Sequence, residues 1–158
     1  MLTPAFSTVA CPDWTLRTIA ARAVEFGYPA VELRTFGDGS RQFAGDPALS
    51  SHEKTLAQFR DAGVSICCIS TGHAFHQAVD PPVLGYAICD TEADVRGAKR
   101  AIDLAAALEC PLVRVFGYIL SGFGGRKATV DRIAERLGKV VDHADRSGVK
   151  IVLENGGD

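Results

Sequence analysis

A carboxylate at the end of an apolar segment is the residue of this chain best placed to do chemistry. Glu154 ends the apolar run 149–153 and is followed at once by Asn155 and the pair Gly156-Gly157. Such a run indicates a buried parallel strand, and the catalytic side chains of α/β folds gather where these strands end. A carboxylate there could transfer protons or bind a cation. The alternative is a solvated Glu that opens a turn before the two glycines.

Other polar side chains lie at or near the ends of apolar runs. His73 comes just after one run, where a histidine either contacts a ligand or hydrogen-bonds to the loop backbone. Glu32 and Arg34 face the same side of a second run, because one residue separates them. Arg34 could hold a phosphate or sugar oxygen, whereas Glu32 is explained more simply as the structural partner of a charge such as Arg114. Phe116 could form the wall of a pocket or belong to the core.

Strand and helix patterns alternate along the whole chain. Five apolar or β-branched runs predict strands at residues 6–10, 30–34, 64–70, 112–116 and 149–153. Apolar residues at helical spacing predict helices between them, with Asp13, Ser50 and Thr91 at their N-terminal ends. The stretch 71–90 is predicted to be a long loop. The resulting order, βαβαβαβαβ, predicts a parallel sheet.

Two α/β architectures compete for this order of elements. A doubly wound nucleotide-binding sheet normally has a glycine-rich phosphate loop after its first strand, but the segment here reads Ala10-Cys11-Pro12-Asp13. A repeat of about 35 residues, taken eight times, gives about 280 residues, which is near a typical (β/α)8 barrel. We therefore predict one α/β domain over residues 1–158, of the (β/α)8 TIM-barrel type, truncated to about four and a half βα units.

Composition and charge argue against several classes of protein. The net charge of -2 is unlike the basic surface of a nucleic-acid-binding protein. The chain has no run of about 18 apolar residues and no signal-peptide pattern at its start, so we expect no membrane partner and a cytoplasmic location. The five cysteines show no CxxC spacing, which favours reduced thiols over a zinc site or disulfides.

Several segments fall in the order and spacing of one enzyme family over the whole chain. Besides the opening strand, they are Gly27–Arg34, Gly72–Phe75, Ala101–Ala105, Val113–Gly117 and Leu153–Asn155. Together they resemble the sugar phosphate isomerase/epimerase family, the xylose isomerase-like TIM barrels. The chain departs from the family at its end, because family members continue through strands that supply an Asp, a His and a second Glu. The resemblance therefore implies the N-terminal half of such a barrel.

The resemblance also implies roles for individual residues. Glu154 matches the family's first metal-binding Glu, which binds a divalent cation (Mn²⁺, Mg²⁺ or Co²⁺) and can act as the catalytic acid/base group. His73, Arg34 and Phe116 are implied to bind the substrate, a small sugar or sugar phosphate. Proton transfer next to a carbonyl uses a base, which takes the proton, and a Lewis acid, which stabilises the carbonyl oxygen. One carboxylate is too few ligands to complete a site for the cation. The implied function is a metal-dependent isomerase or epimerase whose site is incomplete in this chain, so that the chain alone is expected to be inactive.

Two other functions stay open, one of them a non-catalytic truncated or half-barrel module that pairs with a second half. The other is a phosphodiester hydrolase of the endonuclease IV type, which the acidic charge balance disfavours. An open curved sheet would leave inner side chains such as Val115 and Val152 uncovered, and its open edge would favour homo-oligomers. We also expect Glu154, His73 and Arg34 to converge on one face at the C-terminal ends of adjacent strands.

Overall fold

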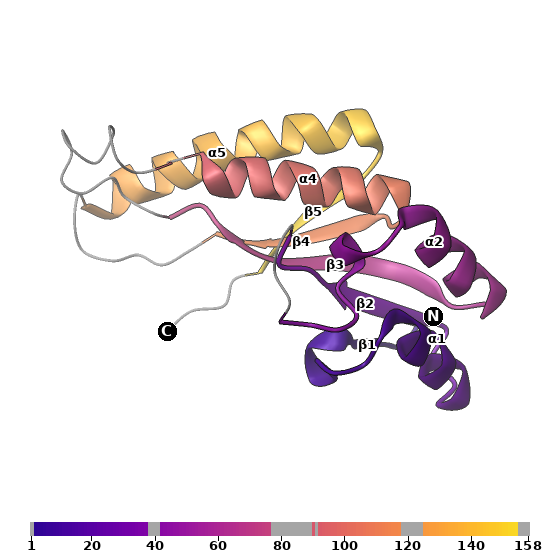
Figure 1. The fold of residues 1–158 in the computed structure, drawn as a ribbon. Helices are drawn as coiled ribbons and strands as arrows, with labels where there is room; N and C mark the ends of the chain where they lie inside the picture. The colour runs from indigo at the N-terminus through magenta and orange to yellow at the C-terminus, as the bar shows by residue number, and fades with distance from the viewer. Residues whose placement is uncertain (1, 38–41, 77–89, 91, 118–124, 155–158) are drawn as a thin grey trace.

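A computed structural model of the chain describes residues 2–37, 42–76, 90, 92–117 and 125–154 (Figure 1). Its strands are β1 (Ala5–Ser7), β2 (Ala30–Arg34), β3 (Ser65–Ala74), β4 (Leu112–Phe116) and β5 (Lys150–Glu154). Its helices are α1 (Leu16–Glu25), α2 (His52–Asp61), α4 (Ala93–Ala107) and α5 (Gly125–Ser147), with two 3₁₀ turns, η1 (Thr8–Ala10) and η2 (Pro47–Leu49). No helix within these ranges is long and apolar enough to cross a bilayer.

Within the described residues, the five strands form one parallel sheet in the order in which they follow each other along the chain. A (β/α)8 barrel has this sequential order, whereas a doubly wound sheet reverses its order at a switch point. In Figure 1 the sheet is twisted, α4 and α5 lie side by side over it, and α1 and α2 lie toward its β1 end. The predicted fold, a TIM-barrel type truncated to about half of its units, is confirmed.

Helices α1 and α2 begin at hydroxyl side chains one or two residues later than predicted, whereas α4 begins after Glu92 without a side-chain cap. Thr15 caps α1 instead of Asp13, and Ser51 caps α2 instead of Ser50. Each hydroxyl accepts a hydrogen bond from a backbone N–H of the first helical turn, which would otherwise lack a partner. Thr91, the third predicted cap, lies outside the described residues. The helices themselves lie where the apolar spacing predicted them.

The lengths of three strands differ from the prediction, and two of the differences move candidate site residues. β1 ends early because the chain turns into η1 at Thr8. β3 is longer than predicted and continues to Ala74, which pairs with Phe116 of β4. His73 therefore lies inside β3 rather than in the loop after it. β5 includes Glu154 as its last residue, which puts this carboxylate at the C-terminal edge of the sheet.

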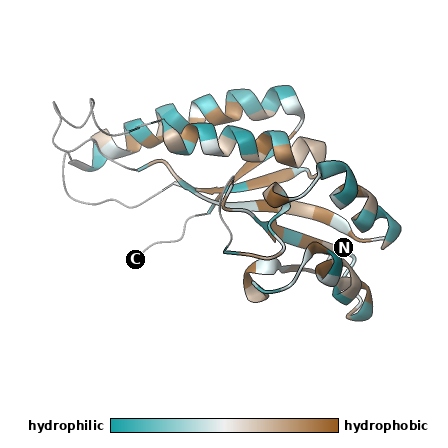
Figure 2. Ribbon diagram, in the orientation of Figure 1, coloured by the Kyte–Doolittle hydropathy of each residue, from teal (hydrophilic) through white to brown (hydrophobic). Residues whose placement is uncertain are grey.

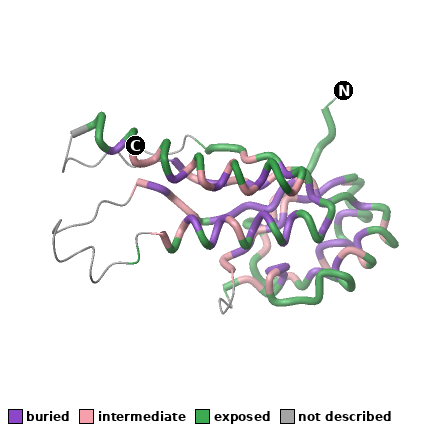
Figure 3. The backbone as a smooth tube through the Cα atoms, turned by 90° about the horizontal axis from the view of Figure 1, so that it is seen from above, coloured by how far each residue is buried: buried purple, intermediate pink, exposed green. Residues whose placement is uncertain are grey.

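The two sides of the sheet are chemically different. On the helix-facing side, Val31, Leu33, Val113 and Val115 are fully buried and form one core with the apolar faces of the helices. Burying each of these side chains contributes about 1.5–3 kcal/mol to stability. Figure 2 shows hydrophobic (brown) segments along the strands and hydrophilic (teal) segments on the helices. Figure 3 shows buried (purple) and exposed (green) segments alternating along the helices. The opposite side, called the inner side below, presents the alternate residues of the same strands.

The prediction of uncovered inner side chains is correct for Val152 and wrong for Val115. Val152 is 37% exposed, whereas Val115 is 0% exposed and belongs to the core. The register explains the difference, because Val115 pairs with Leu153 and shares its side of the sheet, while Val152 lies beside Arg114 on the inner side. Leu153 is 49% exposed even on the helix-facing side, since β5 is the last strand of the sheet.

A glycine in the middle of α4 makes room for His73. A Cβ on Gly97 would lie 2.2 Å from Cε1 of His73, whereas a Cβ on Gly138 of α5 would meet nothing within 4 Å. We expect Gly97→Ala to destabilise the fold by about 1–3 kcal/mol, because the ring or the helix must shift. Gly138→Ala should instead stabilise it by about 0.5–1 kcal/mol, because alanine favours a helix. Urea unfolding of both variants measures the two changes, and a Gly97→Ala protein as stable as Gly138→Ala would contradict this packing.

The uncovered edge at β5 predicts self-association of the chain. Leu153 on β5 and Val130 on α5 are each 49% exposed, but only Leu153 lies on a sheet edge whose backbone can pair with another strand. We expect Leu153→Lys to shift the protein toward monomers and Val130→Lys to leave association unchanged. Sedimentation velocity over a range of concentrations measures this, and a wild-type protein that is monomeric throughout would contradict it.

Candidate functional site

Four charged side chains lie on the inner side of the sheet and are called here the inner charged cluster. They are Glu32 and Arg34 of β2, Arg114 of β4 and Glu154 of β5. Arg34 and Arg114 lie at one level of the sheet, because both pair in register with Ser70 of β3 between them. Glu154 lies two residues further along, at the C-terminal edge. In barrels of parallel strands this edge is where chemistry takes place.

An ion pair between Arg114 and Glu154 joins the two strands of the cluster that are neighbours. Nη1 of Arg114 lies 2.6 Å from Oε2 of Glu154. The Arg114 guanidinium also lies over the ring of Phe116, with its Cζ 4.5 Å from the ring centroid. The Arg114 side chain is 14% exposed and the Glu154 side chain is 46% exposed. Arg114 is therefore held from two sides, while the carboxylate that it contacts is open to solvent.

The predicted pairing of Glu32 with Arg114 is wrong, because each has a nearer partner. Ser7 of β1 donates a hydrogen bond from its hydroxyl to Oε1 of Glu32 at 2.6 Å. Arg114 pairs with Glu154 on the adjacent strand, whereas Glu32 is two strands away. Neighbouring strands are about 4.8 Å apart, so a partner on the next strand is reached without stretching either side chain.

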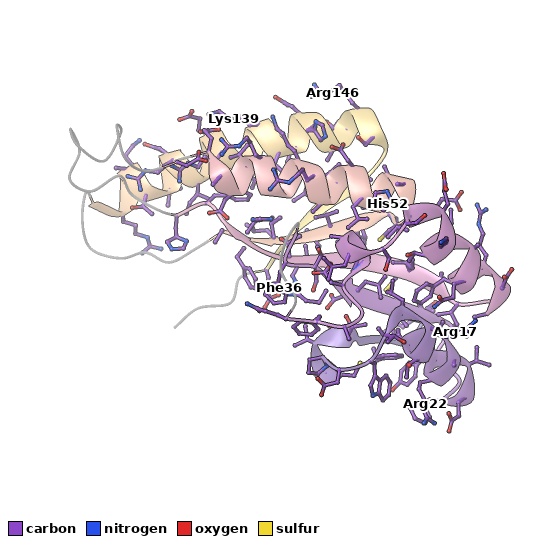
Figure 4. All side chains as sticks on the ribbon, in the orientation of Figure 1. Arg17, Arg22, Phe36, His52, Lys139 and Arg146 are labelled. Carbon is purple, nitrogen blue, oxygen red and sulfur yellow. The ribbon has the colours of Figure 1, made fainter. Side chains whose placement is uncertain are left out.

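Arg34 is placed by contacts of the same kind as those of Arg114. It donates a hydrogen bond to the backbone carbonyl of Thr71 at 2.5 Å, and its Cζ lies 4.6 Å from the ring centroid of Phe36 (labelled in Figure 4). Burial lowers the pKa of the Arg34 guanidinium, and the like charge of Arg114 lowers it further. The carboxylates of the cluster, that of Glu154 included, act in the opposite direction. The structure thus brings Arg34 within electrostatic reach of both Arg114 and Glu154.

His73 lies toward the same end of the sheet but is turned to the helix side. Its Nδ1 lies 3.0 Å from Oδ1 of Asp94 on α4, and its ring occupies the space left by Gly97. The neighbouring Gly72 faces Arg34, so these two successive residues point to opposite sides of the sheet. Arg34 and Glu154 thus share the inner side of the sheet, but their strands, β2 and β5, are not adjacent, and His73 lies between β3 and α4.

Three residues around the cluster were not identified from the sequence: Ser70, Phe36 and Asp46. Ser70 is fully buried between Arg34 and Arg114, and its hydroxyl has no hydrogen-bond partner among the described residues. Phe36 lies under Arg34 and is held by Asp46, whose Oδ2 accepts a hydrogen bond from the Phe36 backbone N–H at 2.8 Å. A serine at the end of a run of Ile and Cys was the available signal, since a polar residue is rare inside a buried strand.

In the described part of the chain the cysteines are free, and burial raises the pKa of each of their thiols. Cys11, Cys67, Cys68 and Cys110 are free, while Cys89 lies outside the described residues. Burial raises the pKa of Cys68 to about 12 and that of Cys110 to about 11. A neutral thiol is a poor nucleophile and a poor metal ligand. These side chains therefore act as small apolar residues, two of them within β3.

The described residues do not by themselves form a cation site. They contain no group of three or more His, Cys, Asp or Glu side chains that could hold a metal ion. Glu154 offers one carboxylate at the open edge of the sheet, whereas Mg²⁺ and Mn²⁺ take about six ligands. The inner charged cluster can orient a carboxylate and attract a polar ligand, and a complete metal site needs further oxygen or nitrogen donors.

Comparisons with known proteins agree with this geometry. Residues 20–158 match the family described as xylose isomerase-like TIM barrel, and no curated protein matches the chain. The solved structure of an L-ribulose 3-epimerase superposes with a TM-score of 0.72 at 18% identity, over 97% of this chain and 49% of that one. The IolI protein, solved with a zinc atom, superposes with a TM-score of 0.71 at 15% identity, over 96% of this chain and 51% of that one. A D-allulose 3-epimerase from Methylomonas sp. superposes with a TM-score of 0.65 at 17% identity, over 97% of this chain and 53% of that one.

These comparisons establish the fold and the family. At such identities the structures show the fold alone, and the chain spans about half the length of each of the three. The family match is independent of them and covers most of the chain. The chain belongs to the family of xylose isomerase-like TIM barrels.

Proposed function

We propose that this chain supplies one half of the active site of a sugar isomerase or epimerase, with Glu154 as its catalytic carboxylate. The observation that carries the proposal is the position of Glu154, at the C-terminal end of β5, half exposed and held by Arg114 at 2.6 Å. Two of the superposed proteins are named as sugar 3-epimerases, which supports a sugar as the substrate class. The proposal concerns the whole protein, because the chain spans half the length of these relatives.

Glu154 acts in this proposal as the group that moves a proton at the carbon next to the substrate carbonyl. A carboxylate does this efficiently only when its oxygen is fixed near the substrate, within about 2.6–3.2 Å of the heavy atom that carries the proton. The ion pair with Arg114 engages Oε2 of Glu154, and we assign Oε1 to the substrate side. Arg114 is thus a positioning residue, itself held against Phe116.

A divalent cation, Mn²⁺, Mg²⁺ or Co²⁺, is part of the proposal, and Glu154 would provide one of its oxygen ligands. When bound, such a cation stabilises the negative charge that develops on the carbonyl oxygen. The remaining donors would come from outside the described residues. We therefore expect the 158-residue chain alone to bind these cations weakly and to have little or no activity.

The substrate, a sugar or sugar phosphate, is proposed to lie against the inner charged cluster. Arg34 would donate hydrogen bonds to hydroxyl or phosphate oxygens, as a guanidinium with several N–H groups can. Phe116 would cover an apolar face of the sugar. His73, the third residue implied to bind substrate, could do so only from the rim, because its ring packs against α4.

A non-catalytic half-barrel module is the second candidate function. It is favoured by one observation, the exposure of Val152 and Leu153 on the edge strand β5, which leaves a surface suited to a second half-barrel or a second copy of the chain. In such a module Glu154 and Arg114 would serve only to keep the edge polar. The two candidates differ in whether removing the carboxylate changes proton transfer.

Exchange of a carbon-bound substrate proton with solvent tests the catalytic role of Glu154 directly. The longest product of the gene that contains this chain is incubated with Mn²⁺ and a ketose in D₂O, and deuterium at the carbon next to the carbonyl is measured by mass spectrometry. We expect Glu154→Gln to slow incorporation by about 100-fold or more, because an amide cannot accept the proton.

The matched control for this test is Glu25→Gln, which changes an exposed Glu on α1 that pairs with Arg22. It should exchange deuterium at the wild-type rate. Incorporation that is equal in Glu154→Gln and the wild type would rule out the catalytic role and leave the half-barrel module. Turnover by the 158-residue chain alone would show instead that its site is complete.

A further inference from the structure

A five-residue motif occurs twice in the chain, at the C-terminal ends of β2 and β4. Residues 33–37 read Leu-Arg-Thr-Phe-Gly, and residues 113–117 read Val-Arg-Val-Phe-Gly. In both copies the residue before the arginine is fully buried in the core. In both copies the arginine guanidinium lies over the phenylalanine ring, with distances from Cζ to the ring centroid of 4.6 Å and 4.5 Å. The two arginines can therefore be compared position by position.

The next strand of the sheet presents a carboxylate to Arg114 and a glycine to Arg34. Arg114 pairs in register with the residue two before Glu154, whose carboxylate lies 2.6 Å from its guanidinium. Arg34 pairs in register with the residue two before Gly72. Gly72 thus has, beside Arg34, the position that Glu154 has beside Arg114.

The space that a side chain at residue 72 would fill is open. Gly72 is exposed, and a Cβ added to it would lie 3.1 Å from Nη2 of Arg34. Apart from the chain neighbours of Gly72, no other atom of the described residues lies within 4 Å of that point. Nη1 of Arg34 donates to the carbonyl of Thr71, whereas Nη2 has no hydrogen-bond partner in the described part of the chain. Nη2 can therefore donate to a group that lies over Gly72.

The charge of Arg34 is only partly compensated. Arg34 forms no ion pair within the described residues, whereas Arg114 pairs with Glu154. Glu32, Glu154 and Asp46 attract Arg34 from further away, Glu32 most strongly of the three. Burial and the like charge of Arg114 outweigh these carboxylates, because the pKa of the Arg34 guanidinium is still lowered. A negative charge in contact with Arg34 would be stabilising.

The carboxylates near Arg34 lie away from the space over Gly72. Glu32 lies at a level four residues before Gly72 along β3, which is about 13 Å at the rise of a parallel strand. Glu154 lies two strands from β3, about 10 Å away. Asp46 is 1% exposed, and both of its oxygens accept hydrogen bonds from backbone N–H groups. The nearest charged group to this space is therefore the Arg34 guanidinium.

We propose that Arg34 and Gly72 form a subsite for a carboxylate of the substrate, which is then a sugar acid. The ligand carboxylate lies beside Arg34 as the Glu154 carboxylate lies beside Arg114, and it accepts a hydrogen bond from Nη2. Because the matching group within this chain is a carboxylate, a carboxylate is favoured over a phosphate. That the ligand is a sugar rests on the function proposed for Glu154, whereas the anion subsite does not.

An NMR titration of the 158-residue chain with glucuronate tests the subsite. Glucuronamide is the neutral analogue of the same shape, and glucose 6-phosphate carries a phosphate at the same carbon. We expect glucuronate to bind at least about tenfold more tightly than glucuronamide, because only glucuronate adds a charge-assisted hydrogen bond. The Nε–H resonance of Arg34 and the backbone N–H resonance of Gly72 should shift during the titration. Equal binding of glucuronamide, tighter binding of glucose 6-phosphate, or shifts centred elsewhere would overturn the proposal.

Gly72→Glu tests the comparison of the two motifs, because it gives Arg34 the carboxylate that Arg114 already has. We expect it to weaken glucuronate binding at least about tenfold, as should Arg34→Gln. The control Gly138→Glu adds the same charge on α5, where a Cβ meets nothing within 4 Å, and should bind like the wild type. Wild-type affinity in Gly72→Glu would contradict the subsite. Melting curves check that the variants fold, and the comparison of glucuronate with glucuronamide on the unmodified chain does not depend on them.

The subsite and the function proposed for Glu154 can fail separately. Glucuronate binding at Arg34, together with equal deuterium exchange in Glu154→Gln and the wild type, would support the subsite and remove the catalytic role. Exchange that depends on Glu154, without glucuronate binding at Arg34, would keep the catalytic role and overturn the subsite.

Discussion

Each strand of the sheet turns alternate side chains to opposite sides, and helices in the described residues cover only one of these sides. This constraint decides which residues can be core and which can do chemistry. Val113 and Val115 are fully buried under the helices, while Arg114 between them faces the inner side. A slip of one residue in register would exchange the two sets, burying an arginine and exposing two valines. The burial of the valines thus fixes where the charged residues point.

The charged side chains of the inner side orient one another more than they stabilise the fold. An ion pair with a half-exposed carboxylate, such as that of Arg114 with Glu154, contributes about 0–1 kcal/mol. A single fully buried valine contributes more than this. The pair instead fixes one carboxylate oxygen at the edge where a substrate would enter, and Phe116 fixes the arginine. A site that is positioned in this way before its ligand arrives loses less freedom on binding.

Much of the fold and part of the site could be predicted from the sequence. Five apolar runs located the strands, and the position of Glu154 after the last run located it at the C-terminal edge. The partner of Arg114 could not be predicted, because pairing depends on the register between strands. The direction of His73 could not be predicted either, because the apolar run ends near Ser70 and does not show that the strand continues to Ala74. Within this longer strand His73 lies three residues after Ser70 and therefore faces the opposite side.

The central proposal is that a cation and a substrate of the whole protein would bind on the inner side of the sheet at Glu154. Paramagnetic broadening by Mn²⁺ in two-dimensional NMR spectra tests it most directly, because fast exchange makes even weak binding visible. We expect the resonances of Phe116 and Val152 to broaden first, those of Ala101 and His52 to stay sharp, and Glu154→Gln to abolish the effect. Broadening centred on His73 and Asp94, or broadening that persists in Glu154→Gln, would contradict the claim.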